Sequence, residues 1–194
     1  MSRYIDLLLH WSRQPSSFAR KIISGAGGLV VFLVVIPGAL IIFGRWVFVS
    51  FEPLLPRWSE WALAILAGVP GLALVTWATA TQWRIGRGTP AYTAPTQHLV
   101  VAGPYRHCRN PIQLGANLYH FAICTVMAGS VTGFFALALG LTIGSSYHKF
   151  VEEKELDARF GEEYRNYRNQ TPFLFLRPWR IIRQRQEGAD NDRK

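Results

Sequence analysis

The chain has 194 residues, about the length of one domain, and combines 49% hydrophobic with only 17% charged residues, which is too apolar for an ordinary soluble domain. Its formal net charge of +9 would suit nucleic acid, but the basic residues are spread over segments beside apolar runs, where lipid headgroups account for them better. We therefore expect a lipid bilayer, and no nucleic acid, as its partner.

Three apolar runs follow one another along the chain. The first, from Gly25 to Gly44, has no charge and is about as long as the 20 residues that cross roughly 30 Å of hydrocarbon as a helix. The second runs from Trp61 to Trp83. The third, Pro111 to His148, is nearly twice a bilayer core and must turn back, most simply at Gly129-Ser130. The fold class predicted is an all-α integral membrane protein with about four transmembrane helices.

The charges between these runs predict an orientation. Residues 1–24 carry net +3, residues 44–60 carry 0, residues 82–112 carry +4 and the tail after His148 carries +2. By the positive-inside tendency, both termini and the loop 82–112 are cytoplasmic. The first run is too long for a signal-peptide core, so we expect a multi-pass protein that keeps it.

The cysteines and histidines do not form a metal-binding pattern. Cys108 lies in the basic loop and Cys124 inside a span, so neither a disulfide nor a zinc site is expected. His120 lies within a span, where a hydrogen bond to a neighbouring helix is a simpler role than metal binding.

The loop 82–112 contains the first candidate binding residues. Asn110-Pro111 is typical of a helix start, since Asn caps the first turn and Pro fits the first helical position. The amides of that turn, with Arg106 and Arg109 before it, favour a carboxylate or phosphate. Contact of these arginines with lipid phosphates is an equal alternative. Gly86-Arg87-Gly88 is only weakly similar to a phosphate loop and is better interpreted as a close backbone approach.

A cytosolic amphipathic helix is predicted after the fourth span. Glu152, Glu153, Leu156, Phe160 and Tyr164 fit its spacing, and Gly161 is expected to bend or end it. The two glutamates are either solvated surface charge or ligands for hydroxyl or ammonium groups. Aromatic residues from Tyr164 to Trp179 are typical of a membrane interface, and residues 181–194 are expected to form a disordered basic tail.

Two linked motifs in residues 82–179 resemble the membrane methyltransferase family that includes isoprenylcysteine carboxyl methyltransferases and phospholipid N-methyltransferases. The first resembles Gly-x-Tyr-x-x-x-Arg-(His/Asn)-Pro-x-Tyr-x-Gly, and the second resembles Glu-Glu-x-x-Leu followed by Phe-Gly-x-x-Tyr-x-x-Tyr. The first is matched by Gly103, Tyr105, Arg109, Asn110, Pro111 and Gly115, and the second by Glu152, Glu153, Leu156, Phe160, Gly161, Tyr164 and Tyr167. Gln113 departs from the pattern, standing where the family usually has Tyr.

The resemblance implies an S-adenosylmethionine-dependent methyltransferase whose lipophilic substrate, an isoprenylcysteine-like carboxylate or a phospholipid amine, enters from the membrane. Methyl transfer from a sulfonium needs alignment and desolvation more than a strong acid or base, so no catalytic triad is required. The catalytic residues expected are Arg109, Tyr164, Arg165 and Tyr167. The cofactor-binding residues expected are Gly86, Gly88, Gly103, Tyr105, Arg109, Asn110, Pro111, Gly115, Glu152 and Glu153.

Two other functions remain open at this point. The C-terminal region of membrane sterol reductases resembles the same family and binds NADPH, although those proteins have more spans. A non-catalytic membrane scaffold is the other alternative, because of Gln113. Under the enzyme reading, residues 1–80 form an N-terminal two-span region and residues 81–180 the methyltransferase-like region, which holds the cofactor loop, the helical hairpin and the C-terminal helix.

Overall fold

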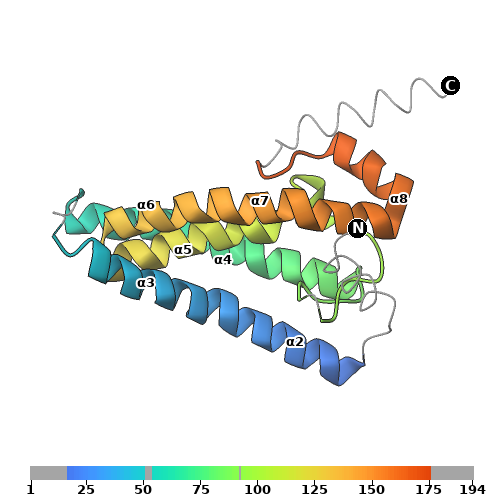
Figure 1. Cartoon of the computed structure of the whole chain (residues 1–194), viewed down its shortest axis with the longest axis horizontal. Coiled ribbons are helices and arrows are strands. Elements are labelled where there is room, and N and C mark those ends of the chain that lie inside the picture. The colour runs from blue at the N-terminus through green and yellow to red at the C-terminus, as the bar shows by residue number, and fades with distance from the viewer. Residues whose placement is uncertain (1–16, 51–53, 92, 176–194) are drawn as a thin grey trace.

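The computed structural model describes residues 17–50, 54–91 and 93–175, and every regular element within them is a helix (Figure 1). The predicted all-α fold is confirmed. The expected tail at residues 181–194 and the aromatic Trp179 lie outside the described residues.

The first span is one long helix made of three segments. Helix α2 (Phe18–Val30) begins at the cap Ser17, whose hydroxyl accepts from the amide of Arg20. It passes through a π-helical turn, Val31–Val35, into α3 (Ile36–Val47). The span therefore extends beyond the predicted Gly25–Gly44 run at both ends.

Pro37 explains how this helix is joined to its neighbour. Because proline has no amide hydrogen, Pro37 cannot donate to either of the carbonyls one turn before it, those of Phe32 and Leu33. The Tyr119 hydroxyl donates to Leu33 O at 3.0 Å, and His120 Nε2 lies 2.7 Å from Phe32 O. The hydrogen bond predicted between His120 and a neighbouring helix is confirmed.

The second span, α4 (Arg57–Arg84), has 28 residues, which is about 42 Å of helix. It packs along α5 (Pro111–Ala128), and small residues bring the two backbones together. A Cβ placed on Gly115 would lie 2.6 Å from Gly71 O, and one on Gly71 would lie 2.8 Å from Gly115 O. Only glycine fits at this crossing.

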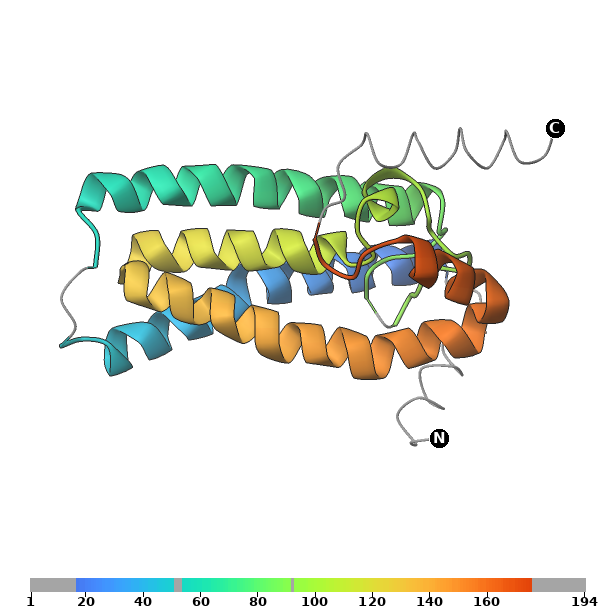
Figure 2. The same ribbon diagram turned by 90° about the horizontal axis from the view of Figure 1, so that it is seen from above.

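The third apolar run turns back where it was predicted to. Helix α5 ends at Ala128, Gly129 has a φ of +89°, and α6 (Ser130–Leu139) begins at the next residue. The predicted hairpin at Gly129-Ser130 is confirmed. We call this end of the molecule the hairpin end. Viewed from above, α5 lies between α4 and α6 (Figure 2).

The amphipathic helix predicted after the fourth span is a direct continuation of it. From α6 the chain runs through a π-helical turn (Gly140–Gly144), α7 (Ser145–Tyr147) and a second π-helical turn (His148–Glu152) into α8 (Glu153–Gln170). The bend comes inside α8, at Gly161, whose φ of 54° and ψ of −122° are not helical. The expectation that Gly161 bends the helix is confirmed.

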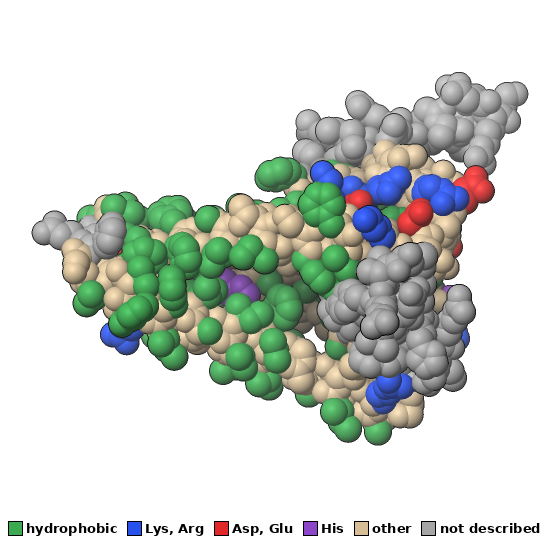
Figure 3. Space-filling model, in the orientation of Figure 1, with side chains coloured by type: hydrophobic (Ala, Val, Ile, Leu, Met, Phe, Trp, Pro, Cys, Tyr) green, Lys and Arg blue, Asp and Glu red, His purple; other side chains and the backbone are tan. Residues whose placement is uncertain are grey.

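Three of the described helices are long and apolar enough to cross a membrane: Phe18–Val47, Arg57–Arg84 and Ser130–Gln170. Helix α5, the remaining helix of the predicted four spans, is not one of these three. It runs between them and buries the polar residues Gln113, Asn117 and His120. Figure 3 shows hydrophobic side chains along the helical shaft and charged side chains gathered over α8. The chain is therefore a multi-pass membrane protein whose polar elements lie at the end opposite the hairpin.

Candidate active site

The loop between α4 and α5 folds back on itself at the α8 end. Gly86 O accepts from the amides of Gln97 and His98, and the Thr89 amide donates to Ala94 O at 2.8 Å. A Cβ on Gly88 would lie 2.4 Å from Pro95 O. Gly86 and Gly88 therefore allow the close backbone approach that the sequence analysis preferred to a phosphate loop. Their packing forms one wall of the region described next.

A 3₁₀ turn, Gly103–Arg106, carries Tyr105 inward against α4. The turn is entered at Gly103, which has a φ of +59° and whose added Cβ would lie 2.8 Å from Thr81 Oγ1. The ring of Tyr105 is buried with Ala78 and Val100. Gly103 therefore allows the backbone conformation that directs the Tyr105 side chain inward.

Arg109 and Asn110 connect the start of α5 to the segment after α8. The Arg109 amide donates to Pro172 O at 2.9 Å, and the Asn110 side chain donates to Phe173 O at 3.0 Å. Asn110 does precede Pro111 at the helix start, but its side chain makes no capping bond. The predicted capping role is wrong because the amide of Asn110 holds the C-terminal segment instead.

The Arg109 guanidinium forms the principal ion pair of this region. Its Nη1 lies 2.6 Å from Glu153 Oε1, and both side chains are largely buried. Its plane also lies over the ring of Phe173, 5.6 Å from the centroid. Arg109 Nε is buried and has no hydrogen-bond partner among the described residues. An unpaired buried donor of a charged group is costly, so this atom is suited to a ligand acceptor.

Helix α8 brings two of the expected aromatic residues to the same place. Tyr164 is 1% exposed, and the Tyr167 hydroxyl donates to Tyr105 O at 2.8 Å. Arg159, two residues before the bend, pairs with Glu155 and donates to Thr96 O, so that the helix is joined to the loop. Arg165 instead is half-exposed and pairs with Asp157.

A partly open pocket of about 80 Å³ lies between the loop, the 3₁₀ turn and α8. Besides Arg109 Nε, the Tyr105 hydroxyl and Gln82 Oε1 are buried and make no hydrogen bond of good geometry in the described chain. The Gln82 side chain is nonetheless near enough to the Tyr105 phenol to lower its pKa, against the larger effect of burial. The polar side chains that line the pocket include Gln82, Thr96, Tyr105, Arg109, Glu152, Glu155, Arg159 and Tyr167.

Burial keeps the groups of the loop neutral. It raises the pKa of the Tyr105 phenol well above its usual value, and the nearby Glu152 adds to this effect. Burial likewise raises the pKa of the Cys108 thiol to about 11. Tyr105 therefore keeps its proton at neutral pH and remains a hydrogen-bond donor.

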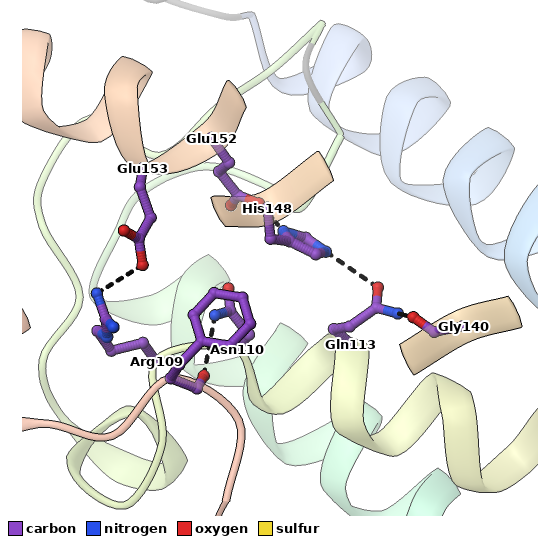
Figure 4. A network of polar contacts seen from close by, with 8 residues as sticks. Arg109, Asn110, Gln113, Gly140, His148, Glu152 and Glu153 are labelled. Carbon is purple, nitrogen blue, oxygen red and sulfur yellow. Dashed lines mark hydrogen bonds and ion pairs between the residues drawn. The ribbon is translucent and has the colours of Figure 1, made fainter. Parts of the chain in front are cut away.

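A chain of polar side chains, absent from the expected site, leads from Glu152 into the helix bundle (Figure 4). His148 Nδ1 contacts Glu152 Oε2, and His148 Nε2 lies 3.0 Å from Gln113 Oε1. Gln113 Nε2 then donates to Asn117 Oδ1 at 2.9 Å and to Gly140 O at 3.1 Å. The sequence signals for this chain of contacts were two four-residue spacings, that of His148 and Glu152 and that of Gln113 and Asn117.

The structure thus gathers part of the expected set. Tyr105, Arg109, Glu152 and Tyr167 line the pocket, and Glu153 reaches it through Arg109. The remaining members lie beside the pocket or elsewhere. Gly86, Gly88, Gly103, Asn110 and Pro111 shape the backbone around it, Tyr164 packs behind Arg109, and Gly115 and Arg165 lie away from it.

Comparison with known proteins gives one family. A model described as phospholipid methyltransferase matches residues 60–163, from the start of α4 into the second half of α8. Among curated proteins, none matches the chain.

Proposed function

Because the chain belongs to the phospholipid methyltransferase family, we propose that it transfers a methyl group from S-adenosylmethionine to a lipophilic acceptor at one face of the membrane. Membership makes it a membrane methyltransferase. The cofactor and the acceptor are our proposal. The observation that carries it is the set of three unpaired buried polar atoms, on Gln82, Tyr105 and Arg109, in one pocket.

The residues present fit this cofactor. Its methionine part has a carboxylate and an amino group, and its ribose has hydroxyls. Arg109 Nε and the Tyr105 hydroxyl are donors for a carboxylate, whereas Gln82 Oε1 is an acceptor for an amino or hydroxyl group. The apolar part of the pocket, including Leu156 and Phe160, is suited to an adenine ring.

In this proposal, the protein binds and orients more than it reacts. When bound, S-adenosylmethionine supplies a methyl group on a positively charged sulfur. Arg109, held by Glu153 and Phe173, would fix the carboxylate end. Tyr167, held on Tyr105 O, would close the side wall and exclude water.

The acceptor is proposed to enter from the bilayer. The helices that carry the site expose large apolar side chains along the shaft, among them Ile143 and Phe150 on the helix that leads to Glu152 (Figure 3). A lipid lying against that surface would have its polar group level with the pocket. Residues 81–180 are accordingly proposed as the catalytic region, with Gln82 of α4 completing the pocket.

The test is a binding and transfer assay on the full chain in lipid nanodiscs. We expect S-adenosylmethionine binding by calorimetry, and a lipid labelled by a methyl-labelled cofactor that mass spectrometry identifies. Glu152→Gln and Glu153→Gln should each weaken binding on the order of tenfold, whereas Glu163→Gln, an exposed position on the same helix, should not. Binding of NADPH instead would favour a reductase, and binding of neither cofactor a scaffold.

A further inference from the structure

The polar chain Glu152–His148–Gln113 specifies which nitrogen of the histidine holds its proton. Gln113 Nε2 faces two acceptors, Asn117 Oδ1 and Gly140 O, so Gln113 Oε1 must be the atom turned to the ring. His148 Nε2 therefore donates. His148 Nδ1 then faces Glu152 Oε2, an acceptor, so their direct contact is the form of the pair that holds a proton between these two atoms. Without that proton the ring is neutral, with its hydrogen on Nε2, and the pair is ready to accept one.

The helix packing makes room for this chain of contacts. A Cβ on Gly144 would lie 2.2 Å from Gln113 Nε2, and one on Gly140 would lie 2.2 Å from Asn117 Oδ1. The two glycines thus leave space for the two amides. Gln113, which replaces the family's usual tyrosine, is buried in that space at 7% exposure and orients the ring.

The pair also has access to both the pocket and water. Glu152 lines the pocket, and the side chains of His148 and Glu152 are 19% and 28% exposed. A proton taken up from the pocket can therefore be released to solvent. Four titratable groups face the pair. They are Tyr105 of the 3₁₀ turn, Glu155 and Tyr164 of α8, and Tyr147, whose ring packs on His148. The residue of α5 that faces the pair is the uncharged Gln113.

We infer that the Glu152–His148 pair, oriented by Gln113, accepts the proton that a primary ammonium acceptor loses before methylation. This inference rests on the proposed function and narrows its acceptor to a lipid amine. A carboxylate acceptor is already a nucleophile and needs no base. An ammonium has no free lone pair, so a proton acceptor beside it is required.

Methyl transfer to a protonated amine begins with the loss of a proton. One N–H bond breaks, and the proton goes to the pair, which holds it between Glu152 Oε2 and His148 Nδ1. The freed lone pair on nitrogen forms the bond to the methyl carbon as the carbon–sulfur bond breaks, and that electron pair stays on sulfur as a neutral thioether. The methylated ammonium leaves, and the pair releases its proton to water. Glu152 touches the acceptor, and His148 and Gln113 are positioning residues.

The first measurement needs no turnover. In protein with ¹⁵N-labelled histidine, we identify the ring nitrogens of His148 by their loss in His148→Gln. The neutral ring of the parent should carry its proton on Nε2 alone, and Gln113→Leu should populate both tautomers, since it removes the acceptor that selects one. A parent ring protonated on Nδ1 alone would contradict the geometry on which the inference depends.

The second measurement uses phosphatidylethanolamine in phosphatidylcholine nanodiscs, with a farnesylated cysteine as the carboxylate acceptor. His148→Gln should bind S-adenosylmethionine as the parent does, yet turn over the amine roughly 10²-fold more slowly near neutral pH. The deficit should shrink as pH rises, because the ammonium then loses its proton to solvent unaided. The exposed His98→Gln is the matched control and should behave as the parent.

The outcomes separate the inference from the proposed function. Parental turnover and pH profile in His148→Gln, or labelling of the carboxylate acceptor alone, would overturn the inference while the methyltransferase stands. A parent that binds the cofactor but labels neither acceptor also counts against a lipid amine. A parent that binds no S-adenosylmethionine would overturn the proposed function itself.

Discussion

Arg109 is the side chain on which most contacts of the candidate site converge. It lines the pocket, pairs with Glu153 and lies over the ring of Phe173, and its Nε has no hydrogen-bond partner among the described residues. The two contacts and the remaining donor use the planar, multiply donating guanidinium, which an ammonium on a flexible stem does not reproduce. The alternative role for this residue, a lipid-phosphate anchor, requires only the positive charge.

Arg109→Lys is therefore expected to lower S-adenosylmethionine affinity at least tenfold, about 1.5–3 kcal/mol for a hydrogen bond to a charged group. Calorimetry on the protein in nanodiscs measures this affinity. Arg87→Lys is the control, because Arg87 lies on the same loop and is exposed. Equal affinities in the two variants would identify Arg109 as a membrane anchor and not as part of the site.

Glu60 shows that a buried carboxylate can also serve structure alone. It lies at the hairpin end, 2% exposed, where it accepts from the Ser130 amide at 2.8 Å and pairs with Arg57. The first amides of a helix have no intrahelical partner, and a negative charge there is favoured by the helix dipole. Glu60 thus caps α6 from α4 and holds the hairpin to its neighbour.

Glu60→Ala should leave the Ser130 amide buried and unpaired, at a cost of about 1–3 kcal/mol. We expect a lower apparent melting temperature in detergent, with S-adenosylmethionine affinity of the folded protein unchanged because the pocket lies at the other end. Glu163→Ala, at an exposed site, should melt as the parent does. Loss of cofactor affinity with an unchanged melting temperature would refute this structural role.

At the scale of elements, the bend in α8 decides where its aromatic residues lie. Before Gly161 the helix continues the fourth span, and after it the helix turns so that Tyr164 and Tyr167 reach the start of α5. A straight helix would carry both tyrosines away from Tyr105. The bend needs a φ of 54°, which glycine adopts at little cost.

Gly161→Ala tests the bend, since nothing lies within 4 Å of the added methyl and the effect is conformational. A left-handed backbone costs a residue with a Cβ about 1–2 kcal/mol. We expect weaker cofactor binding, and a longer distance between spin labels at positions 157 and 168 as the helix straightens. Gly27→Ala, within a regular helix and equally uncrowded, should change neither measurement.

At the scale of the whole molecule, the charge distribution predicts which face holds the pocket. The basic segments are 1–24 and 82–112, and their described residues lie at the α8 end (Figure 1). Segment 44–60 carries no net charge, and its described residues lie at the hairpin end. From the positive-inside tendency we predict that the pocket and both termini are cytosolic, on the side where the proposed cofactor is available.

Single cysteines at the exposed positions Ser50 and Pro90, in a background without Cys108 and Cys124, report this orientation through a membrane-impermeant thiol reagent. We expect position 90 to be labelled from the cytosolic side and position 50, at the hairpin end, from the opposite side. Ser130 of the hairpin is only 1% exposed and is unsuitable for labelling. The reverse labelling pattern would show the opposite orientation in the membrane, with the pocket on the side away from the cytosolic cofactor.

The sequence alone determined the helices and their order in the membrane. A transmembrane helix depends on its own residues, because an uncharged run such as Gly25–Gly44 must form its backbone hydrogen bonds within itself. A run of nearly twice the bilayer thickness must turn near its middle, where Gly129 is a weak helix former. The start of α5 at Pro111 and the bend at Gly161 also follow from local backbone preferences.

Only the tertiary structure decided which polar groups meet. Arg109 pairs with Glu153 across 44 residues, and Gln113 contacts His148 across 35. Both contacts depend on the rotation of α5 against the fourth span, which close packing at Gly140 and Gly144 sets and which no periodicity within one helix reveals. For the same reason Gly115, a motif residue, was placed in the cofactor site by its position in the sequence, whereas packing of α5 on α4 turns it toward Gly71.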